Sequence, residues 1–193
     1  ANYVLEKYGN LNILVNNLGG ASKYGSFQDL KQADWQTSFE LNLLTMVNLT
    51  KVFEKQLIAT TGNTILNISS IVGHQPGFFN PHYSAMKAAT INLSKHLANI
   101  YASKELRVNV ICPGPVKTAS WGENIKFQAD KLNENFEKMS EIVDEKESVK
   151  IPLARVGKTS DIATLAVTLC SEKCGWLTGT CINIDGGKTR GII

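Results

Sequence analysis

The segment Thr64-Ile-Leu-Asn-Ile-Ser-Ser70 is a short, mostly apolar run, and a loop rich in glycine and proline separates it from Tyr83-Ser-Ala-Met-Lys87. The first stretch predicts a buried β-strand, because a strand covered on both faces is apolar at nearly every position. The second stretch opens a helical pattern that continues to about Ser103. A buried strand, a loop and a long helix in succession are typical of a parallel α/β sheet.

The same alternation extends in both directions along the chain. Residues 2–8 predict the end of a helix that stops at Gly9, and a long helix is expected over residues 35–59 with Asp34 as its N-cap. Further buried strands are expected at residues 11–15, 107–112 and 181–184. We therefore expect residues 1–193 to form part of one α/β domain, a doubly wound parallel sheet of the Rossmann type with helices on both faces.

The composition is that of a globular protein. The chain has 193 residues, 43% hydrophobic and 19% charged, and a net charge of +3 with scattered basic residues. No nucleic-acid surface or membrane-binding face is predicted, and small molecules are the expected partners. Because no apolar run has the length of a membrane span and no leader-like segment opens the chain, a cytoplasmic location is expected.

The cysteines do not predict a metal site. Cys170 and Cys174 could share a helix face, but no paired Cys-x-x-Cys spacing and no nearby histidine accompany them. Buried free thiols are the expectation for these two residues and for Cys112 and Cys181.

Tyr83 and Lys87 lie one helical turn apart and are expected on the same helix face. A free phenol titrates near ~10, and a neighbouring ammonium that stabilises the phenolate would lower this pKa and make Tyr83 a general acid–base. Ser70 follows a predicted strand, where open parallel sheets bind ligands. Taken singly, the tyrosine and lysine could be a solvated helix face and the serine a turn residue.

Taken together, several motifs resemble the short-chain dehydrogenase/reductase family, and the resemblance runs from about Leu11 to Gly187. The motifs are Asn16-Asn-Leu-Gly19, Asn67-Ile-Ser-Ser70, Tyr83-Ser-Ala-Met-Lys87, Pro113-Gly-Pro-Val-Lys-Thr118 and Ile184-Asp-Gly-Gly187. This resemblance implies an oxidoreductase that transfers a hydride between NAD or NADP and a carbonyl or secondary alcohol.

The resemblance also implies a role for each matching residue. The implied catalytic residues are Asn42, Ser70, Tyr83 and Lys87. The implied cofactor-binding residues are Asn16, Gly19, Tyr83, Lys87, Pro113, Gly114, Val116 and Thr118. In the family, the residue matching Asn42 holds a water that connects to the active-site lysine, although the helical pattern alone favours an amide that faces solvent. Leu18 departs from the alanine usual in the family.

Several substrate classes are compatible with the sequence. His74, Phe78, Phe79 and His82 lie in or next to the loop expected to line the substrate pocket, although the histidines could equally be surface residues. The 3-oxoacyl-(acyl carrier protein) reductases are one group of relatives, and Lys104 could meet an acidic carrier protein. Sugar, steroid and small-alcohol dehydrogenases share the same motifs, and isomerases or dehydratases using the same tyrosine and lysine are a further possibility. Residues 119–150 predict one or two amphipathic helices that form a mobile lid over the pocket.

One family motif is missing. No Thr-Gly-x-x-x-Gly-x-Gly segment precedes the strand at residues 11–15, so that strand is expected to be an exposed apolar edge. We expect either the later part of a longer reductase or a truncated, non-catalytic remnant that acts as an oligomer partner or binding module. Two Gly-Lys-Thr sequences, at residues 157–159 and 187–189, lack the upstream glycine of a P-loop. Homodimers or homotetramers through helices at residues 35–59 and 83–103 are implied by the resemblance.

Overall fold

The computed structural model describes residues 2–21 and 23–191, and the chain folds as two compact units. The first unit comprises Ala1–Cys112 and Ala166–Ile182, and the second comprises Pro113–Leu165 and Asn183–Ile193. Within the described residues, no helix combines the length and apolar character that a bilayer span requires.

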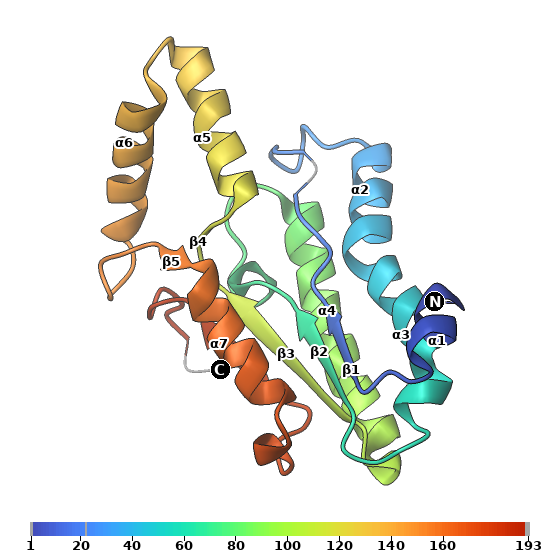
Figure 1. Cartoon of the computed structure of the whole chain (residues 1–193). Helices are drawn as coiled ribbons and strands as arrows, with labels where there is room; N and C mark the ends of the chain where they lie inside the picture. Colours follow the sequence, from blue (N-terminus) through green and yellow to red (C-terminus); the bar gives the residue numbers. More distant parts are fainter. Residues whose placement is uncertain (1, 22, 192–193) are drawn as a thin grey trace. The chain divides into compact units, whose positions relative to one another are not determined.

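The first unit alternates strands and helices, as the sequence predicted (Figure 1). Its elements are α1 (Asn2–Tyr8), β1 (Ile13–Asn16), α2 (Gln32–Phe39), η1 (Glu40–Leu44), α3 (Thr45–Leu57), β2 (Thr64–Ile68), η2 (Ile71–Gly73), α4 (Pro81–Tyr101), η3 (Ala102–Lys104), most of β3 (Arg107–Pro113), the end of α7 (Thr159–Cys170), η4 (Glu172–Cys174) and the start of β6 (Cys181–Ile184).

The strands form a parallel sheet. Among the described residues it is four-stranded with the order β1, β2, β3, β6, and β2 pairs in parallel register with both β1 and β3. Every residue of β2 from Thr64 to Asn67 is buried, as expected for a strand covered on both faces. Ile65 and Leu66 are apolar, and the two polar side chains, Thr64 and Asn67, are hydrogen-bonded. The predicted parallel α/β fold is confirmed. As expected, β1 lies at the sheet edge, with Ile13 46% and Val15 44% exposed.

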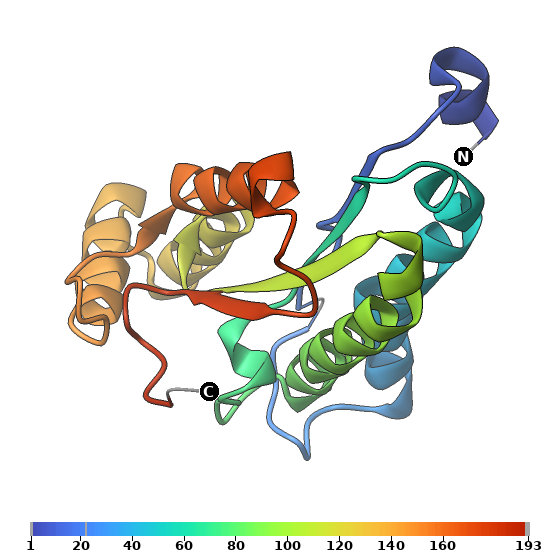
Figure 2. The same cartoon turned by 90° about the horizontal axis from the view of Figure 1, so that it is seen from below.

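The core of the first unit lies between β1–β3 and the helices α3 and α4. Figure 2 shows both helices along the same side of these strands. The buried residues of α3 recur every three or four positions, so that one face of the helix points inward. The core side chains are Leu14, Phe53, Leu57, Ile65, Leu97, Ala98, Leu106 and Val108.

Two helix beginnings depend on local chemistry. Pro81 begins α4, where the missing N–H of proline costs nothing, and the preceding Asn80 is left-handed with φ 60°. The prediction that Asp34 caps a helix beginning at Trp35 is wrong, because α2 begins at Gln32. Asp34 lies in the first turn instead, and its carboxylate accepts a hydrogen bond from the Lys31 backbone N–H at 2.8 Å.

The second unit is built around a helical hairpin. α5 (Ala119–Leu132) and α6 (Phe136–Ser148) pack against each other around Ile125, Ala129 and Met139 (Figure 1). Two short strands, β4 (Val116–Lys117) and β5 (Gly157–Lys158), pair in parallel beside it. The predicted amphipathic character of residues 119–150 is confirmed, and of the one or two helices expected the structure has two. Their action as a lid stays a prediction.

Candidate active site

The end of β2 is tied to α4 by two hydrogen bonds around Lys87. The Ser69 hydroxyl donates to the Lys87 backbone carbonyl at 2.8 Å, and the Lys87 ammonium donates to the Ile68 carbonyl at 2.9 Å. Lys87 is only 4% exposed. The first turns of α4 are therefore fixed to the strand end, and Lys87 is held in one position.

The predicted serine, tyrosine and lysine lie together. The Ser70 side chain is hydrogen-bonded to the Tyr83 phenol, and the Lys87 Nζ lies 5.6 Å from the centre of the Tyr83 ring. The Ser70 hydroxyl also accepts a hydrogen bond from the Val72 backbone N–H at 3.4 Å, which caps the short helix η2. The structure thus brings a hydroxyl, a phenol and an ammonium to the carboxyl end of one strand, where parallel sheets bind ligands.

The pKa of Tyr83 is shifted in the opposite direction to the one predicted. Burial raises it to about 12, and the hydrogen bond with Ser70 offsets only part of this rise. Burial also lowers the pKa of Lys87 to about 8. Both shifts have the same physical cause, since a poorly solvated site disfavours the phenolate and the ammonium alike. At neutral pH the phenol is therefore protonated and can donate a proton.

Asn42 is buried, so the interpretation of a solvent-facing amide is wrong. It is 3% exposed and lies in the π-helical turn η1 between α2 and α3. Its Oδ1 accepts from the Gly20 N–H at 2.9 Å, and its Nδ2 donates to the Gly20 and Ser38 carbonyls, each at 3.1 Å. The amide of Asn42 therefore fixes the turn that follows β1. π-Helical turns occur frequently at functional sites.

Gly19 brings Asn42 and Lys87 together. A Cβ at Gly19 would lie 2.7 Å from Asn42 Oδ1 and 3.1 Å from Lys87 Nζ, and its φ is +151°. A side chain at this position would displace both polar groups. Only a glycine lets the turn after β1 approach the lysine this closely.

Asn16 belongs to a row of buried polar side chains. Its Nδ2 donates to Asn67 Oδ1 at 2.8 Å, Asn67 Nδ2 donates to Ser94 Oγ at 2.8 Å, and Ser94 Oγ donates to the Thr90 carbonyl at 2.6 Å. The row links β1, β2 and α4. Asn16 Oδ1 is buried and has no hydrogen-bond partner among the described residues.

The predicted nicotinamide-binding segment belongs to the second unit. The Gly114 N–H donates to the Ile184 carbonyl at 3.0 Å, and a Cβ on Gly114 would lie 2.7 Å from Asp185 Cβ. Thr118 caps α5, since its hydroxyl accepts from the Trp121 N–H at 3.3 Å, and Val116 lies in β4. The Pro113–Thr118 segment therefore packs against the Ile184-Asp-Gly-Gly motif, and the predicted contacts with a cofactor stay a prediction.

The predicted specificity residues differ in exposure. Phe78 is 97% and Phe79 66% exposed, and His74 is also exposed. His82 is fully buried, with its ring 6.1 Å from the ring of Trp35 in an edge-on arrangement. Burial lowers the pKa of His82, so the imidazole is neutral at neutral pH. The prediction that His82 lines a pocket is therefore replaced by a packing role.

Two residues that position the site were not identified from the sequence. Ser69 anchors the backbone of Lys87, as described above. Gly73 lets η2 lie directly on α4, because a Cβ there would be 2.9 Å from the Lys87 carbonyl carbon and 3.0 Å from the Ala88 nitrogen. Ser69 is the third residue of the Asn67-Ile-Ser-Ser70 motif and Gly73 lies three residues beyond it, and this position in the sequence is the only signal for either residue.

A family model described as Enoyl-(Acyl carrier protein) reductase matches residues 1–189. The chain belongs to the short-chain dehydrogenase/reductase family. This is a family of NAD(P)-dependent oxidoreductases, so the family and the class of enzyme predicted from the motifs are confirmed.

Individual relatives in the short-chain dehydrogenase/reductase family cover almost the whole chain. The 3-oxoacyl-(acyl-carrier-protein) reductase FabG of Thermotoga maritima is 31% identical over 184 residues, which are 95% of this chain and 68% of FabG. Oxidoreductase UcpA of Escherichia coli is 36% identical over 187 residues, 95% of this chain and 67% of UcpA.

A solved structure agrees with the fold. The L-sorbose reductase of Gluconobacter frateurii, crystallised with NADPH and L-sorbose, is 27% identical and superimposes with a TM-score of 0.90 over 99% of this chain and 71% of the reductase. This likeness supports the same fold and the same class of cofactor.

Proposed function

We propose that this chain catalyses the NAD(P)-dependent interconversion of a carbonyl compound and a secondary alcohol. The observation that carries the proposal is the hydrogen-bonded pair of Ser70 and Tyr83 beside the buried Lys87. A hydroxyl and a phenol directed at the same substrate oxygen can stabilise the negative charge that develops there. The Lys87 ammonium next to the phenol can return a proton to Tyr83.

The residues around Lys87 fit a nicotinamide cofactor. Because Gly19 has no side chain, the turn after β1 packs closely on Lys87, and the unpaired, buried Oδ1 of Asn16 is a free acceptor at the end of β1. Asn16, Gly19, Tyr83 and Lys87, together with Pro113, Gly114, Val116 and Thr118, are proposed to hold this cofactor. When bound, a nicotinamide cofactor supplies or accepts the hydride.

The chain's own residues then move the proton. In the reductive direction Tyr83 donates its phenolic proton to the substrate oxygen while the Ser70 hydroxyl donates a hydrogen bond to the same atom. Lys87 restores the proton to Tyr83. Asn42 holds the Gly20 turn next to the lysine and, as the family resemblance implies, takes part in a proton path to bulk solvent.

Two relatives point to different substrate classes. The similarity to FabG favours a 3-oxoacyl thioester, and the similarity to L-sorbose reductase favours a ketose. Purified protein tested with a 3-oxoacyl thioester, L-sorbose and simple ketones, each with NADH and NADPH, distinguishes these classes by loss of the reduced nicotinamide absorbance. Cofactor binding without turnover on any carbonyl would instead favour a non-catalytic binding module.

Tyr83→Phe tests the acid–base role. The variant removes only the hydroxyl, so we expect turnover to fall by about 10²–10⁴-fold, the usual contribution of a positioned proton donor, with cofactor affinity nearly unchanged. Turnover by absorbance and cofactor binding by fluorescence titration provide the two readouts. Tyr8→Phe, which removes the same hydroxyl from a tyrosine that is 65% exposed and has no role in the proposed site, serves as the matched control. Near-normal turnover in Tyr83→Phe would contradict the proposed role.

We also propose that the protein forms a homodimer or homotetramer through α3 and α4. Val52 on α3 and Ile100 on α4 are each 50% exposed, which leaves apolar surface on both helices. Sedimentation of the wild type and of Val52→Glu tests this, since a monomeric wild type excludes it.

A further inference from the structure

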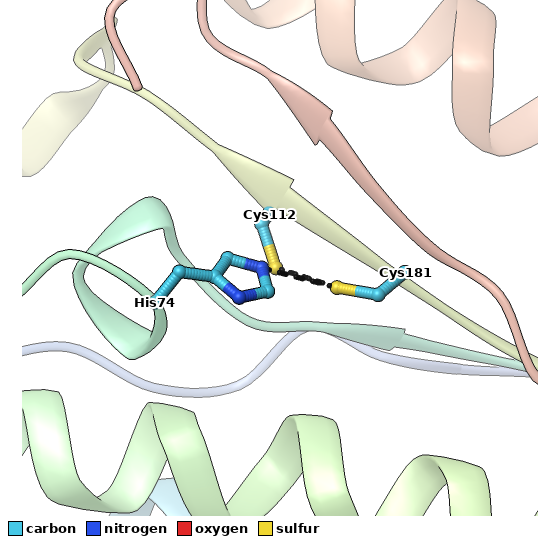
Figure 3. Close-up of side chains that lie close together, drawn as sticks. All are labelled: His74, Cys112 and Cys181. Atoms are coloured by element: carbon cyan, nitrogen blue, oxygen red, sulfur yellow. Dashed lines mark hydrogen bonds between the residues drawn. The ribbon is translucent and has the colours of Figure 1, made fainter. Parts of the chain in front are cut away.

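Three potential metal ligands converge beside the end of β3. His74 follows η2, Cys112 lies on β3, and Cys181 begins β6, and all belong to the first unit (Figure 3). The two sulfur atoms are 3.4 Å apart, and Cys181 Sγ lies 3.2 Å from His74 Nε2. The three ligand atoms all lie within 4.8 Å of one another.

The backbone fixes this arrangement independently of the three side chains. β3 and β6 are neighbours in the sheet, and the Val110 N–H donates to the Thr180 carbonyl at 3.0 Å, which sets the positions of the two cysteines. The His74 N–H donates to the Ile71 carbonyl at 3.0 Å, which closes the η2 turn. The ligands are therefore presented by ordered segments.

The surroundings of the cluster suit a soft metal ion. Cys112 is fully buried in an apolar cluster with Ile71 and Val110, against which Ile91 and Cys181 also pack. The Ser70 backbone N–H is hydrogen-bonded to the Cys112 sulfur, the kind of outer contact that orients and tunes a thiolate ligand. His74 is exposed, so the cluster opens to solvent on the histidine side and an ion can enter.

The distances can be compared with known coordination geometry. With Zn–S bonds of about 2.3 Å and Zn–N bonds of about 2.0–2.1 Å, a tetrahedral ion separates two sulfurs by roughly 3.8 Å and a sulfur from a nitrogen by roughly 3.6 Å. A planar three-coordinate ion requires roughly 4.0 and 3.8 Å. The observed sulfur–sulfur distance of 3.4 Å and sulfur–nitrogen distance of 3.2 Å are nearer to the tetrahedral values. Small side-chain rotations would move the ligand atoms apart by the few tenths of an ångström that remain.

We propose that His74, Cys112 and Cys181 form a zinc-binding site with a fourth, tetrahedral position open to water or another ligand. Two thiolates and one imidazole are a ligand set that Zn²⁺ prefers, and three protein ligands with an open position are typical of non-structural zinc sites. Cysteine coordinates zinc as the thiolate, so binding of the ion releases to the buffer any proton still held by the Cys112 and Cys181 thiols. The ion would join η2, β3 and β6 next to Ser70.

Cobalt substitution tests the site directly, without reference to catalysis. Fully reduced, chelator-treated protein is titrated with Co²⁺, and we expect one equivalent to give the strong visible bands of tetrahedral cobalt and a near-ultraviolet thiolate charge-transfer band. Zn²⁺ should then displace the cobalt stoichiometrically. Wild-type protein without these bands, or with only the weak spectrum of octahedral cobalt, would overturn the proposal.

Matched variants locate the binding. His74→Ala changes an exposed residue and Cys181→Ser changes a half-buried one, so both variants should fold. Each should weaken Zn²⁺ binding at least about 100-fold in a competition titration. Replacing a residue that only hydrogen-bonds to a metal ligand already costs about 10–100-fold, and removal of the ligand itself should cost at least as much. The double variant Cys170→Ser/Cys174→Ser leaves the cluster intact and should bind as the wild type does. Loss of binding in that control, with retention in His74→Ala, would refute the assignment.

A disulfide is the competing use of the same two cysteines. Its sulfurs must be about 2.05 Å apart, more than 1 Å closer than they lie here. Intact mass after hydrogen peroxide treatment distinguishes the two, since a Cys112–Cys181 disulfide lowers the mass by two hydrogens and hydrogen peroxide is reduced to water. Rapid disulfide formation in protein that fails to bind Zn²⁺ when reduced would replace the metal site with a redox site.

Discussion

Replacing Gly19 with alanine tests the geometry of the active site most sharply. The added Cβ would lie 2.7 Å from Asn42 Oδ1 and 3.1 Å from Lys87 Nζ, and the first distance is shorter than real Cβ contacts. The φ of +151° is also unfavourable for any residue with a side chain. The backbone or both polar side chains must therefore move.

The expected cost follows from these two effects. A backbone strain of this kind costs on the order of 1–3 kcal/mol. Displacing Asn42 also weakens its hydrogen bonds to Gly20 and Ser38, each with a net contribution of about 1 kcal/mol. We expect the free energy of unfolding of Gly19→Ala to fall by about 2–4 kcal/mol, a large part of the ~5–15 kcal/mol that stabilises a typical domain.

The adjacent glycine provides the control. A Cβ on Gly20 meets nothing within 4 Å, and Gly20 is not among the positive-φ glycines. Gly20→Ala should therefore change stability by less than about 1 kcal/mol, and in the stabilising direction if at all. Urea unfolding gives both values, and turnover should fall at least about tenfold in Gly19→Ala only, because Lys87 moves. Equal unfolding midpoints for the two variants would refute the reasoning.

Two further predictions concern buried cations. Burial lowers the pKa of Lys87 to about 8, so between about pH 8 and pH 10 the unfolded chain binds more protons at this residue than the folded chain, and stability rises with pH by at most about 3 kcal/mol. Urea midpoints should show this rise in the wild type and not in Lys87→Met. Arg107, 6% exposed, donates to the carbonyls of Leu169, Ser171 and Leu177, so Arg107→Met should lower the free energy of unfolding by about 2–4 kcal/mol, measured the same way, while the exposed Lys104→Met should not.

The strands and the shared helix face of Tyr83 and Lys87 could be predicted because their signals are local. A strand buried on both faces is mostly apolar, and β2 carries Ile65, Leu66 and Ile68. Tyr83 and Lys87 share a face because of helical periodicity alone. The position of Ser70 beside Tyr83 required the family resemblance, since no local rule fixes the path of the loop that joins them.

The remaining features depend on contacts between distant residues. Asn42 is buried because a π-helical turn aims its amide at Gly20, and neither the turn nor the partner has a sequence signature. The prediction of no metal site rested on the spacing of the four cysteines along the chain and on the lack of a histidine near Cys170 and Cys174. The sheet instead joins two other cysteines and a histidine that lie far apart in the chain, so no spacing rule could detect the cluster.

Burial explains why the pKa of Tyr83 is higher than the sequence predicted. It also determines which of the substrate oxygen, Tyr83 and Lys87 holds a proton most strongly in the proposed reaction. An alkoxide, with a conjugate acid near the ~15.7 of water, is a stronger base than the phenolate of Tyr83, whose pKa is about 12. That phenolate is in turn a stronger base than Lys87, whose pKa is about 8. Each transfer, from Lys87 toward Tyr83 and from Tyr83 to the substrate oxygen, is therefore downhill in the reductive direction. A tyrosine pKa lowered below that of Lys87 would reverse the first of these steps, so the buried phenol suits Tyr83 to the role of proton donor.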